Sequence, residues 1–343
     1  MHSCETAGAC LTLPRRVGLA VFLGLSMTRS AAVALLAGAM AVFGTSSWFL
    51  AAATEATASL DKAQRSRATE EAYRAEIEKF RQDREARLKA DTGWLTIAGL
   101  FFLSGGQSGF GSDPLNDIVL PVPAPARAGT FEFRDGRVAV KAADGGSLII
   151  NGKPVAGAEL TSDVRGEPDS IAIQDLALWV HESGERRAIR LRDKNSRLRT
   201  EFTGVKWFPI NEAYRVDARF VPYDKPKTLK VPNILGDVDT AHSPGLVVFS
   251  IGGQEFKMEP IAEDGDDEFW FVFRDLTSGK DTYAAARFLY TPVPVNGRLV
   301  LDFNKSENPP CAYNPYTTCP LPPEQNRLRI RIDAGERIYQ PHF

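Results

Sequence analysis

The pattern of apolar and polar positions changes twice along the chain. Residues 31–54 contain no charged side chain, whereas residues 60–89 are rich in charge and lack proline and glycine. From Gly93 onward, short apolar or alternating runs continue almost to the end. Because helices and strands impose different spacings on their buried residues, each change indicates a new structural unit. The expected units are a signal peptide or membrane anchor in 1–53, a charged amphipathic helix in 54–90, a β-sandwich in 91–203 and a second β-rich domain in 204–343.

The helical segment has an apolar stripe with one interruption. Tyr73, Ile77, Phe80 and Leu88 recur at the spacing of one helical face, and Arg84 falls among them. The opposite face carries mixed charges. We predict a helix of about seven turns that ends before residue 91. Its apolar stripe is expected to pack against the domain that follows.

The rest of the chain has the pattern of a mainly β protein. Glycine, proline, asparagine and aspartate separate the apolar runs, as in all-β sandwiches and barrels. No long helical pattern lies between the runs, which disfavours a parallel sheet with crossover helices. Strands are predicted in the first half at 118–120, 130–133, 138–141, 147–150, 170–173, 177–181 and 188–192. In the second half they are predicted at 213–220, 245–251, 254–260, 268–273, 282–289 and 298–303, with a last strand in which Leu328, Ile330 and Ile332 alternate with arginines.

The N-terminus has the features of a targeting segment. Arg29 precedes the uncharged run, and Ala51 and Ala53 offer a signal-peptidase site. A run of about 23 residues is also long enough to span a bilayer as a helix. A second start at Met27 would leave a compact leader. We therefore predict an exported or membrane-anchored protein, with a cleaved leader and a retained anchor as alternatives.

Composition narrows the classes of partner and cofactor. The 343 residues carry a formal net charge of -2, so nothing in this balance attracts a phosphate backbone and nucleic-acid binding is not expected. The sequence lacks the G-x-S-x-G, H-E-x-x-H, P-loop and G-x-G-x-x-G motifs. With four histidines in the whole chain, we predict neither a metal site nor a cofactor. We interpret His181 as a strand-edge residue.

Residues 302–336 are the most informative segment. They hold two cysteines, a series of prolines, and asparagines beside tyrosines. Proline fixes φ and removes a backbone donor, so this segment is predicted to form a rigid, irregular loop. Rigid loops on a scaffold often carry binding and catalysis. We therefore place the candidate site at this loop.

Short motifs recur along this loop and upstream of it. The loop contains D-F-N at 302–304, N-P-P-C-A-Y at 308–313, T-C-P-L-P-P at 318–323, N-R-L at 326–328 and A-G-E at 334–336. Together with residues 93–100 and 273–289, these motifs resemble a bacterial and archaeal family named domain of unknown function 1684. One departure is Ser306-Glu307, where the family pattern has Ala-Tyr. The resemblance covers roughly residues 93–336 and implies no established activity.

The first β segment carries a second resemblance. Gly111, the N-D-I-V-L run at 116–120 and the I-I-N-G-K-P-V run at 149–155 sit where a forkhead-associated sandwich keeps similar motifs. Forkhead-associated domains hold phosphothreonine with an arginine after the glycine and with a Ser-Arg-x-His element. Here Ser112, not an arginine, follows the glycine. Of the Ser-Arg-x-His element, residues 123–129 contain only an arginine, Arg127. The resemblance implies a forkhead-associated-like fold without phosphopeptide binding.

An arginine in an apolar run points to a further part of the site. Arg287 lies among apolar residues, where a buried charge requires a partner. We expect Asp302 or Glu336 to supply that partner. The arginine then either forms a purely structural pair or grips a carboxylate or phosphate of a ligand. Asp275 is expected to accept backbone N–H bonds in a turn.

Cys311 and Cys319 have three interpretations. Export would place them in an oxidising space, where a disulfide is expected. Closing so small a loop would stabilise the fold by about 2–3 kcal/mol. A cysteine nucleophile would need a nearby base, and a zinc site would need two further ligands. The sequence favours the disulfide.

Two hypotheses for function follow. In the first, the protein binds or acts on an unidentified small molecule, as a binding protein or an enzyme, through a concave polar pocket near the loop. In the second, it is a structural or protein-interaction module, and its signature side chains satisfy one another without a pocket. The candidate site residues are Asp275, Thr277, Tyr283, Arg287, Asp302, Asn304, Cys311, Tyr313, Asn326 and Glu336.

Overall fold

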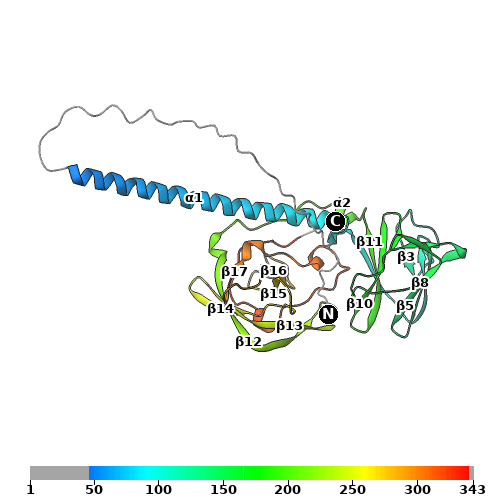
Figure 1. Ribbon diagram of the computed structural model, residues 1–343. Coiled ribbons are helices and arrows are strands. Elements are labelled where there is room, and N and C mark those ends of the chain that lie inside the picture. The colour runs from blue at the N-terminus through cyan, green and yellow to red at the C-terminus, as the bar shows by residue number, and fades with distance from the viewer. Residues whose placement is uncertain (1–45, 165, 340–343) are drawn as a thin grey trace, which may run out of the picture. The chain divides into compact units, whose positions relative to one another are not determined.

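The computed structural model of the protein describes residues 46–164 and 166–339 (Figure 1). The described residues divide between Ala75 and Glu76 into two units, and residues 76–339 form the larger one. The predicted signal peptide or anchor lies largely in residues 1–45, outside the described residues. No helix within the described ranges is long and apolar enough to cross a membrane.

Helix α1, Ser46–Lys89, ends where the sequence predicts it. In the part of α1 that belongs to the larger unit, Ile77, Arg84 and Leu88 are buried. Leu88 packs in one cluster with Leu95 and Tyr313, so the apolar stripe packs against the following domain as expected. Arg84 does not interrupt this stripe, because its side chain is buried with the rest of the face. A second, short helix, α2, spans Arg197–Thr200.

Residues 97–193 form a sandwich of two sheets (Figure 1). One sheet has the strand order β1-β11-β10-β9-β6-β7, and the other has the order β3-β2-β4-β5-β8. One apolar core joins the sheets, and Phe110 stacks on Phe131 within it at 4.4 Å between ring centroids. The strands are β1 Ile97–Phe102, β2 Gly106–Gly111, β3 Ile118–Val119, β4 Gly129–Arg134, β5 Arg137–Ala142, β6 Leu148–Ile150, β7 Lys153–Val155, β8 Gly157–Leu160, β9 Ile171–Ile173, β10 Leu176–Ser183 and β11 Arg186–Asp193.

The second half of the chain builds a four-stranded and a two-stranded sheet. The first has the order β14-β13-β12-β17, and the second pairs β15 with β16. A core rich in phenylalanine joins the two sheets, with Phe273 and Phe303 in edge contact at 5.6 Å. The mainly β fold predicted from the sequence is therefore confirmed. The strands are β12 Arg215–Pro232, β13 Val238–Ile251, β14 Gln254–Met258, β15 Glu268–Phe273, β16 Arg287–Pro292 and β17 Arg298–Asp302.

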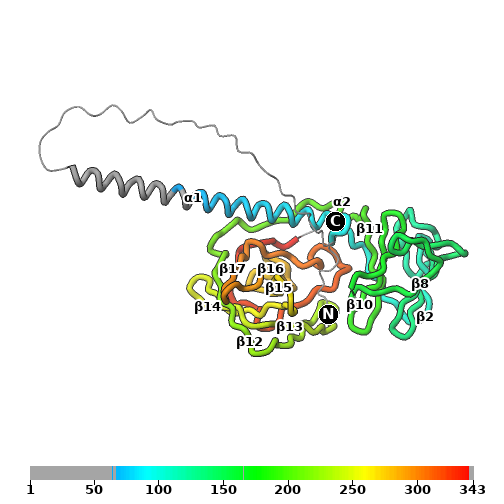
Figure 2. The backbone as a smooth tube through the Cα atoms, viewed as in Figure 1, coloured from blue at the N-terminus to red at the C-terminus, as the bar shows by residue number. Residues whose placement is uncertain are grey.

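Two strand predictions in the second half are wrong. Strand β16 begins at Arg287 instead of residue 282, because residues 277–282 close a turn on themselves. The alternating segment around Leu328 forms an isolated bridge instead of a strand. It is joined to residues 274–276 by three backbone hydrogen bonds, one of them from Leu328 N to Arg274 O. After β17 the chain, orange in Figure 2, follows an irregular path. The hydrophobic pattern also misses β1, β2, β7 and β8.

Candidate functional site

Arg287 is buried and paired, but its partner is neither of the two that the sequence predicts. Its Nη1 donates to Asp275 Oδ2 at 2.6 Å. The guanidinium also donates to the backbone oxygens of Ile332 and Ala334. The register between β15 and β16 explains why Asp275, instead of Asp302 or Glu336, is the partner. Phe273 at the end of β15 pairs with Arg287, so Asp275, two residues further on, comes beside the guanidinium.

Asp275 also holds the turn that follows it. Its second carboxylate oxygen, Oδ1, accepts a hydrogen bond from the backbone N–H of Thr277 at 2.6 Å, as predicted. The hydroxyls of Thr277 and Thr282 bond each other at 2.8 Å. This turn leads directly to Tyr283 and then to Arg287. One carboxylate therefore fixes both the turn and the first residue of β16.

Three further candidate residues connect separate backbone segments. Asn326 accepts from Glu259 N at 2.7 Å and donates to Glu259 O and Val272 O. Asn304 exchanges two hydrogen bonds with the backbone of Asn211. Asp302 Oδ1 accepts from Asn304 N at 3.1 Å. These buried side chains satisfy backbone groups that strands do not pair, which is the role of a scaffold.

Glu336 lies at the centre of a buried polar cluster between α1 and the loop. Its Oε1 accepts from Arg84 Nε at 2.8 Å. Its Oε2 accepts from Tyr313 Oη at 2.5 Å and from Asn308 N at 2.6 Å. Arg84 also contacts Glu307, at 3.0 Å between Nη1 and Oε2. Helix, loop and C-terminal segment thus meet in one hydrogen-bonded group.

The electrostatics of this cluster follow from two carboxylates around one buried arginine. Burial raises the pKa of Glu336; Arg84 opposes the rise and Glu307 adds to it. Burial also disfavours the charged Arg84, but Glu307 and Glu336 outweigh it and raise its pKa. Arg87 adds a second positive charge at 2.7 Å from Glu307. The cluster is therefore close to charge balance.

Sequence reasoning missed Arg84 and Glu307 as members of the site. Arg84 gave a signal, because a charge on an otherwise apolar helical stripe needs a buried partner. Glu307 gave one as well, since it departs from the family pattern. The structure shows what the departure does: Glu307 bridges Arg84 and Arg87 of α1.

The cysteines are free thiols, so the predicted disulfide is absent from the structure. The backbone N–H of Cys311 donates to Cys319 Sγ at 3.2 Å, and the two thiols hydrogen-bond each other. Cys311 is half-buried and Cys319 is buried. The Tyr283 hydroxyl is hydrogen-bonded to Cys311.

Hydrogen bonding sets the ionisation of these groups. The hydrogen bond with Cys319 lowers the pKa of Cys311, and the Tyr283 hydroxyl adds to this effect against the cost of burial. Burial raises the pKa of Tyr283, and Cys311 raises it further. The phenol therefore keeps its proton and donates it to the sulfur. Thiolate, rather than thiol, is the reactive form of cysteine.

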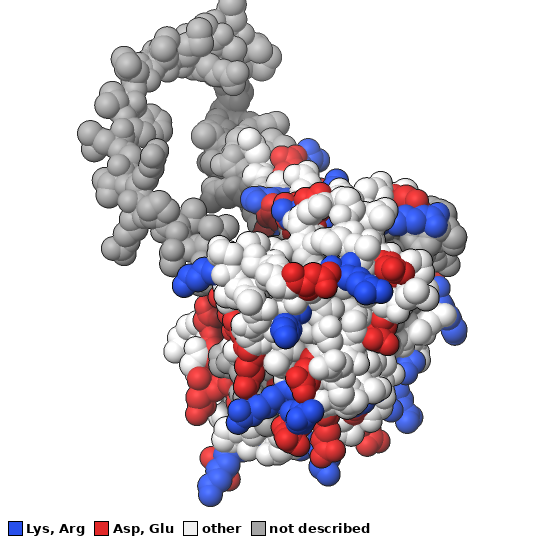
Figure 3. Space-filling view, turned by 90° about the vertical axis from the view of Figure 1, so that its right-hand side faces the viewer, with Lys and Arg blue, Asp and Glu red and all other residues white. Residues whose placement is uncertain are grey.

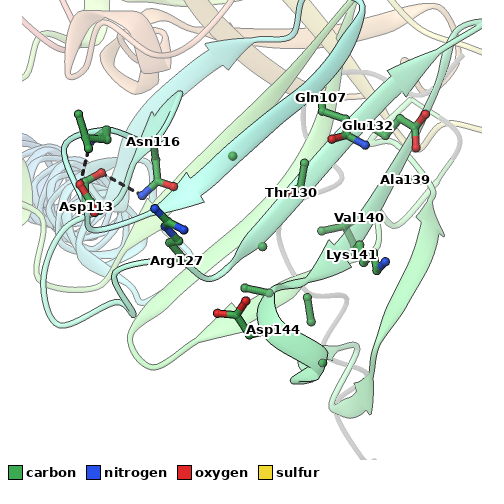
Figure 4. Close-up of a pocket in the computed structure, with 16 residues that line it drawn as sticks. Gln107, Asp113, Asn116, Arg127, Thr130, Glu132, Ala139, Val140, Lys141 and Asp144 are labelled. Atoms are coloured by element: carbon green, nitrogen blue, oxygen red, sulfur yellow. Dashed lines mark hydrogen bonds between the residues drawn. The ribbon is translucent and has the colours of Figure 1, made fainter.

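A separate hollow lies on the β-sandwich (Figure 4). It measures about 760 Å³ and lies against the sandwich sheet. Thr130, Ala139, Arg127 and Asp144 are among the residues that line it. None of the ten candidate residues lines it. The concave polar pocket that the first hypothesis requires at the loop is thus not formed by this hollow.

His181 lies in β10, where it pairs with Ala188 of β11, whereas β9 adjoins β10 only at residues 176–178. The His181 side chain is buried. Among the described residues, no group of three or more histidine, cysteine or acidic side chains could hold a metal ion. On the face seen in Figure 3, acidic and basic side chains are interspersed.

Comparison with known proteins gives a family and no activity. Residues 200–337 match the model of a family described as "Protein of unknown function (DUF1684)". An uncharacterized protein of Haloarcula marismortui, solved by solution NMR, is 28% identical over 40% of this chain and 78% of its own length, with a TM-score of 0.35. No curated protein matches the chain. The forkhead-associated likeness finds no support here and stays a prediction.

Proposed function

On the premise that residues 200–337 place this chain in the DUF1684 family, we propose that the protein acts on a small thiol-reactive molecule through Cys311 and Cys319. The substrate class is a low-molecular-weight disulfide. The reaction is thiol–disulfide exchange at the proline-rich loop. This proposal takes the first hypothesis and confines its chemistry to the part of the loop that solvent reaches.

One observation carries the proposal: the half-buried Cys311 lies beside a second thiol, with its backbone N–H donating to Cys319 Sγ at 3.2 Å, and both Cys319 and the Tyr283 phenol lower its pKa. A thiolate attacks a disulfide faster when neighbours stabilise its charge near ambient pH. The buried Cys319 is then placed to attack the mixed disulfide. Two cysteines with these different exposures match the roles of an attacking and a resolving thiol.

The exchange balances in two steps. The Cys311 thiolate attacks one sulfur of the substrate disulfide, forms a mixed disulfide and releases one substrate thiolate. Cys319 loses its proton and attacks the Cys311 sulfur, which releases the second substrate thiolate and closes a Cys311–Cys319 disulfide. The substrate is reduced by two electrons and the protein is oxidised by two. A small dithiol would return the pair to the reduced form.

A structural role is the second candidate for the remaining signature residues. Asp275, Arg287, Asn304, Asn326 and Glu336 are buried and hydrogen-bonded within the protein. They fit the second hypothesis, in which the signature holds the fold together. In our proposal these residues support the loop, while the thiols carry the chemistry.

The location of the protein bears on this chemistry. We propose that it is exported or membrane-anchored, because of the uncharged run at 31–54. An oxidising compartment would favour the disulfide form of the pair. The disulfide predicted from the sequence would then be one state of a redox cycle instead of a permanent staple.

Oxidised glutathione and mass spectrometry test the thiol proposal. With Cys319→Ser, the glutathione adduct should accumulate on Cys311, because no resolving thiol remains. With the unchanged chain, a Cys311–Cys319 disulfide should form and two glutathiones should be released. Tyr283→Phe should slow the first step, since the donor to the sulfur is lost.

The outcomes separate the two candidate functions. Equal adduct yields on Cys311→Ser and on the unchanged chain would show that other thiols react and would refute the proposal. A Cys311 that fails to react in the folded protein, but reacts after unfolding, would leave the structural role. Cys4 and Cys10 lie outside the described residues, so the adduct is mapped by peptide instead of counted.

A further inference from the structure

Three side chains from distant parts of the chain form a series of contacts at the loop of residues 302–336, which we call the cysteine loop. His181 Nδ1 lies 2.7 Å from Asp163 Oδ2. On the other side of the ring, His181 Nε2 lies 3.3 Å from Thr318 Oγ1. Asp163 follows β8, His181 belongs to β10 and Thr318 belongs to the loop. Hydroxyl, imidazole and carboxylate thus occur in the order of a nucleophile, its base and the group that orients the base.

The hydrogen bonds define which ring nitrogen carries the proton. When Nδ1–H donates to Asp163, the lone pair of Nε2 faces the Thr318 hydroxyl. Burial lowers the pKa of His181, and Arg190 adds to this effect, whereas Asp163 and Asp239 oppose it. The imidazole is therefore neutral at neutral pH. A neutral ring with a free lone pair can accept a proton from the hydroxyl.

The backbone beside Thr318 is held by hydrogen bonds, and Thr318 itself is partly exposed. Next to Thr318, the loop is fixed to the β12–β13 turn by hydrogen bonds from Ile234 N to Cys319 O and from Leu321 N to Pro232 O. His181 is 7% exposed, whereas Thr318 is only partly buried. A small molecule can therefore approach Thr318 while the base stays shielded from water.

We propose that Thr318, His181 and Asp163 form a nucleophile–base–orienter relay that hydrolyses small carboxylic esters. Thr318 Oγ1 attacks the acyl carbon as its proton passes to His181 Nε2. The ester C–O bond breaks, and the alcohol leaves with that proton. Water then attacks the acyl-threonine, gives one proton to His181, and releases the carboxylic acid as the hydroxyl takes the proton back.

This site differs from the thiol site in its reacting atom, although Thr318 and Cys319 are neighbours in sequence. The alternative is that the 3.3 Å contact merely docks the loop on the sandwich. A docking contact would contribute to stability but not to ester turnover, whereas the relay needs both the hydroxyl and the carboxylate behind the imidazole for turnover. The two roles therefore predict different results for an isosteric change and for a change at Asp163.

Hydrolysis of p-nitrophenyl acetate by the full chain tests the relay. Thr318→Val keeps the shape of the side chain and removes the hydroxyl, so kcat/KM should fall by about 10²- to 10⁴-fold. Thr318→Ser keeps the hydroxyl and should retain activity. Asp163→Asn should lower kcat and alter the pH profile of the reaction. Thr130→Val, the same change on the sandwich surface, serves as the control.

Each remaining outcome decides the question. An acetyl group mapped to Thr318 after rapid quenching would support the relay. Retention of activity in Thr318→Val, or no hydrolysis by the unchanged chain, would overturn it. If Cys311→Ser abolishes ester turnover, sulfur is the nucleophile and the relay is refuted, while the thiol proposal stands. Conversely, loss of the glutathione reaction alone would leave the relay intact.

Discussion

Arg287 and Asp275 are almost fully enclosed, so the free energy of each charge depends on the other. Their side chains are 1% and 0% exposed, and the guanidinium donates to the carboxylate at 2.6 Å. Removing one partner of a buried ion pair leaves an uncompensated charge, which costs more than the pair itself contributes. Arg287 is therefore expected to serve the fold.

Arg287→Met should lower the free energy of unfolding by about 3–5 kcal/mol. Chemical denaturation measures the change. Adding Asp275→Asn should recover part of the loss, because the orphaned charge is then removed. Arg298→Met, at an exposed position of β17, is the matched control and should change stability little. A loss at Arg287 no larger than at Arg298 would show that the pair is not required for folding.

His181 makes the stability of the sandwich depend on pH. Burial lowers the pKa of His181 below its ordinary value of 6.5. The unfolded chain thus binds the proton more tightly than the folded chain does. The stability that neutral His181 contributes is present above pH 6.5 and is lost as pH falls through the lower, folded pKa.

His181→Gln should flatten the decline in melting temperature between pH 7 and pH 5. Each unit by which the folded and unfolded pKa values differ corresponds to about 1.4 kcal/mol. Thermal melts at a series of pH values check this. A decline in His181→Gln as steep as in the unchanged chain would contradict the assignment.

At the scale of elements, the end of α1 and the cysteine loop form one unit of structure. Arg84 and Arg87 are one turn apart on the helix, and both contact Glu307. Arg84 is buried, whereas the Arg87 side chain is 54% exposed. Because buried pairs leave an isolated charge when broken and exposed pairs do not, the two arginines should differ in effect.

Arg84→Met should lower the free energy of unfolding by about 3–5 kcal/mol, because Glu336 and Glu307 would lose their shared cation. Arg87→Met should cost about 1 kcal/mol or less. Both values come from denaturant titration. Arg87→Met, on the same helix, is the matched control for Arg84→Met. Similar costs for the two variants would show that the cluster does not depend on burial.

At the scale of the whole molecule, the redox state that the two thiols adopt depends on the compartment in which the mature chain resides. The uncharged run at 31–54 and the Ala51-x-Ala53 pattern predict export. A cleaved chain should begin near residue 54, and a retained anchor would keep this segment in the membrane fraction. Intact mass and fractionation of protein from its native host measure this. A soluble cytoplasmic protein that starts at Met1 or Met27 would contradict both forms.

The sequence by itself determined the elements that depend on local spacing. Short apolar or alternating runs located β4, β5, β9, β10, β11 and β15, because a strand buries either one face, with a period of two, or both faces. The end of α1 was readable because helical spacing stops before Gly93. The segment around Leu328 has alternation as well, but its pairing with residues 274–276 stays an isolated bridge, since spacing alone does not fix how far two segments run side by side.

Only the tertiary structure decided which polar side chains meet. The sequence identified Arg287 as a buried charge, yet Asp275 instead of Asp302 or Glu336 pairs with it, because the β15–β16 register brings them together. Glu336 instead meets Arg84, from which 252 positions separate it. Local pattern records whether a side chain is buried, while the partner depends on how distant segments pack. For the same reason, the alignment of Thr318 with His181 was absent from the sequence and appeared only in the fold.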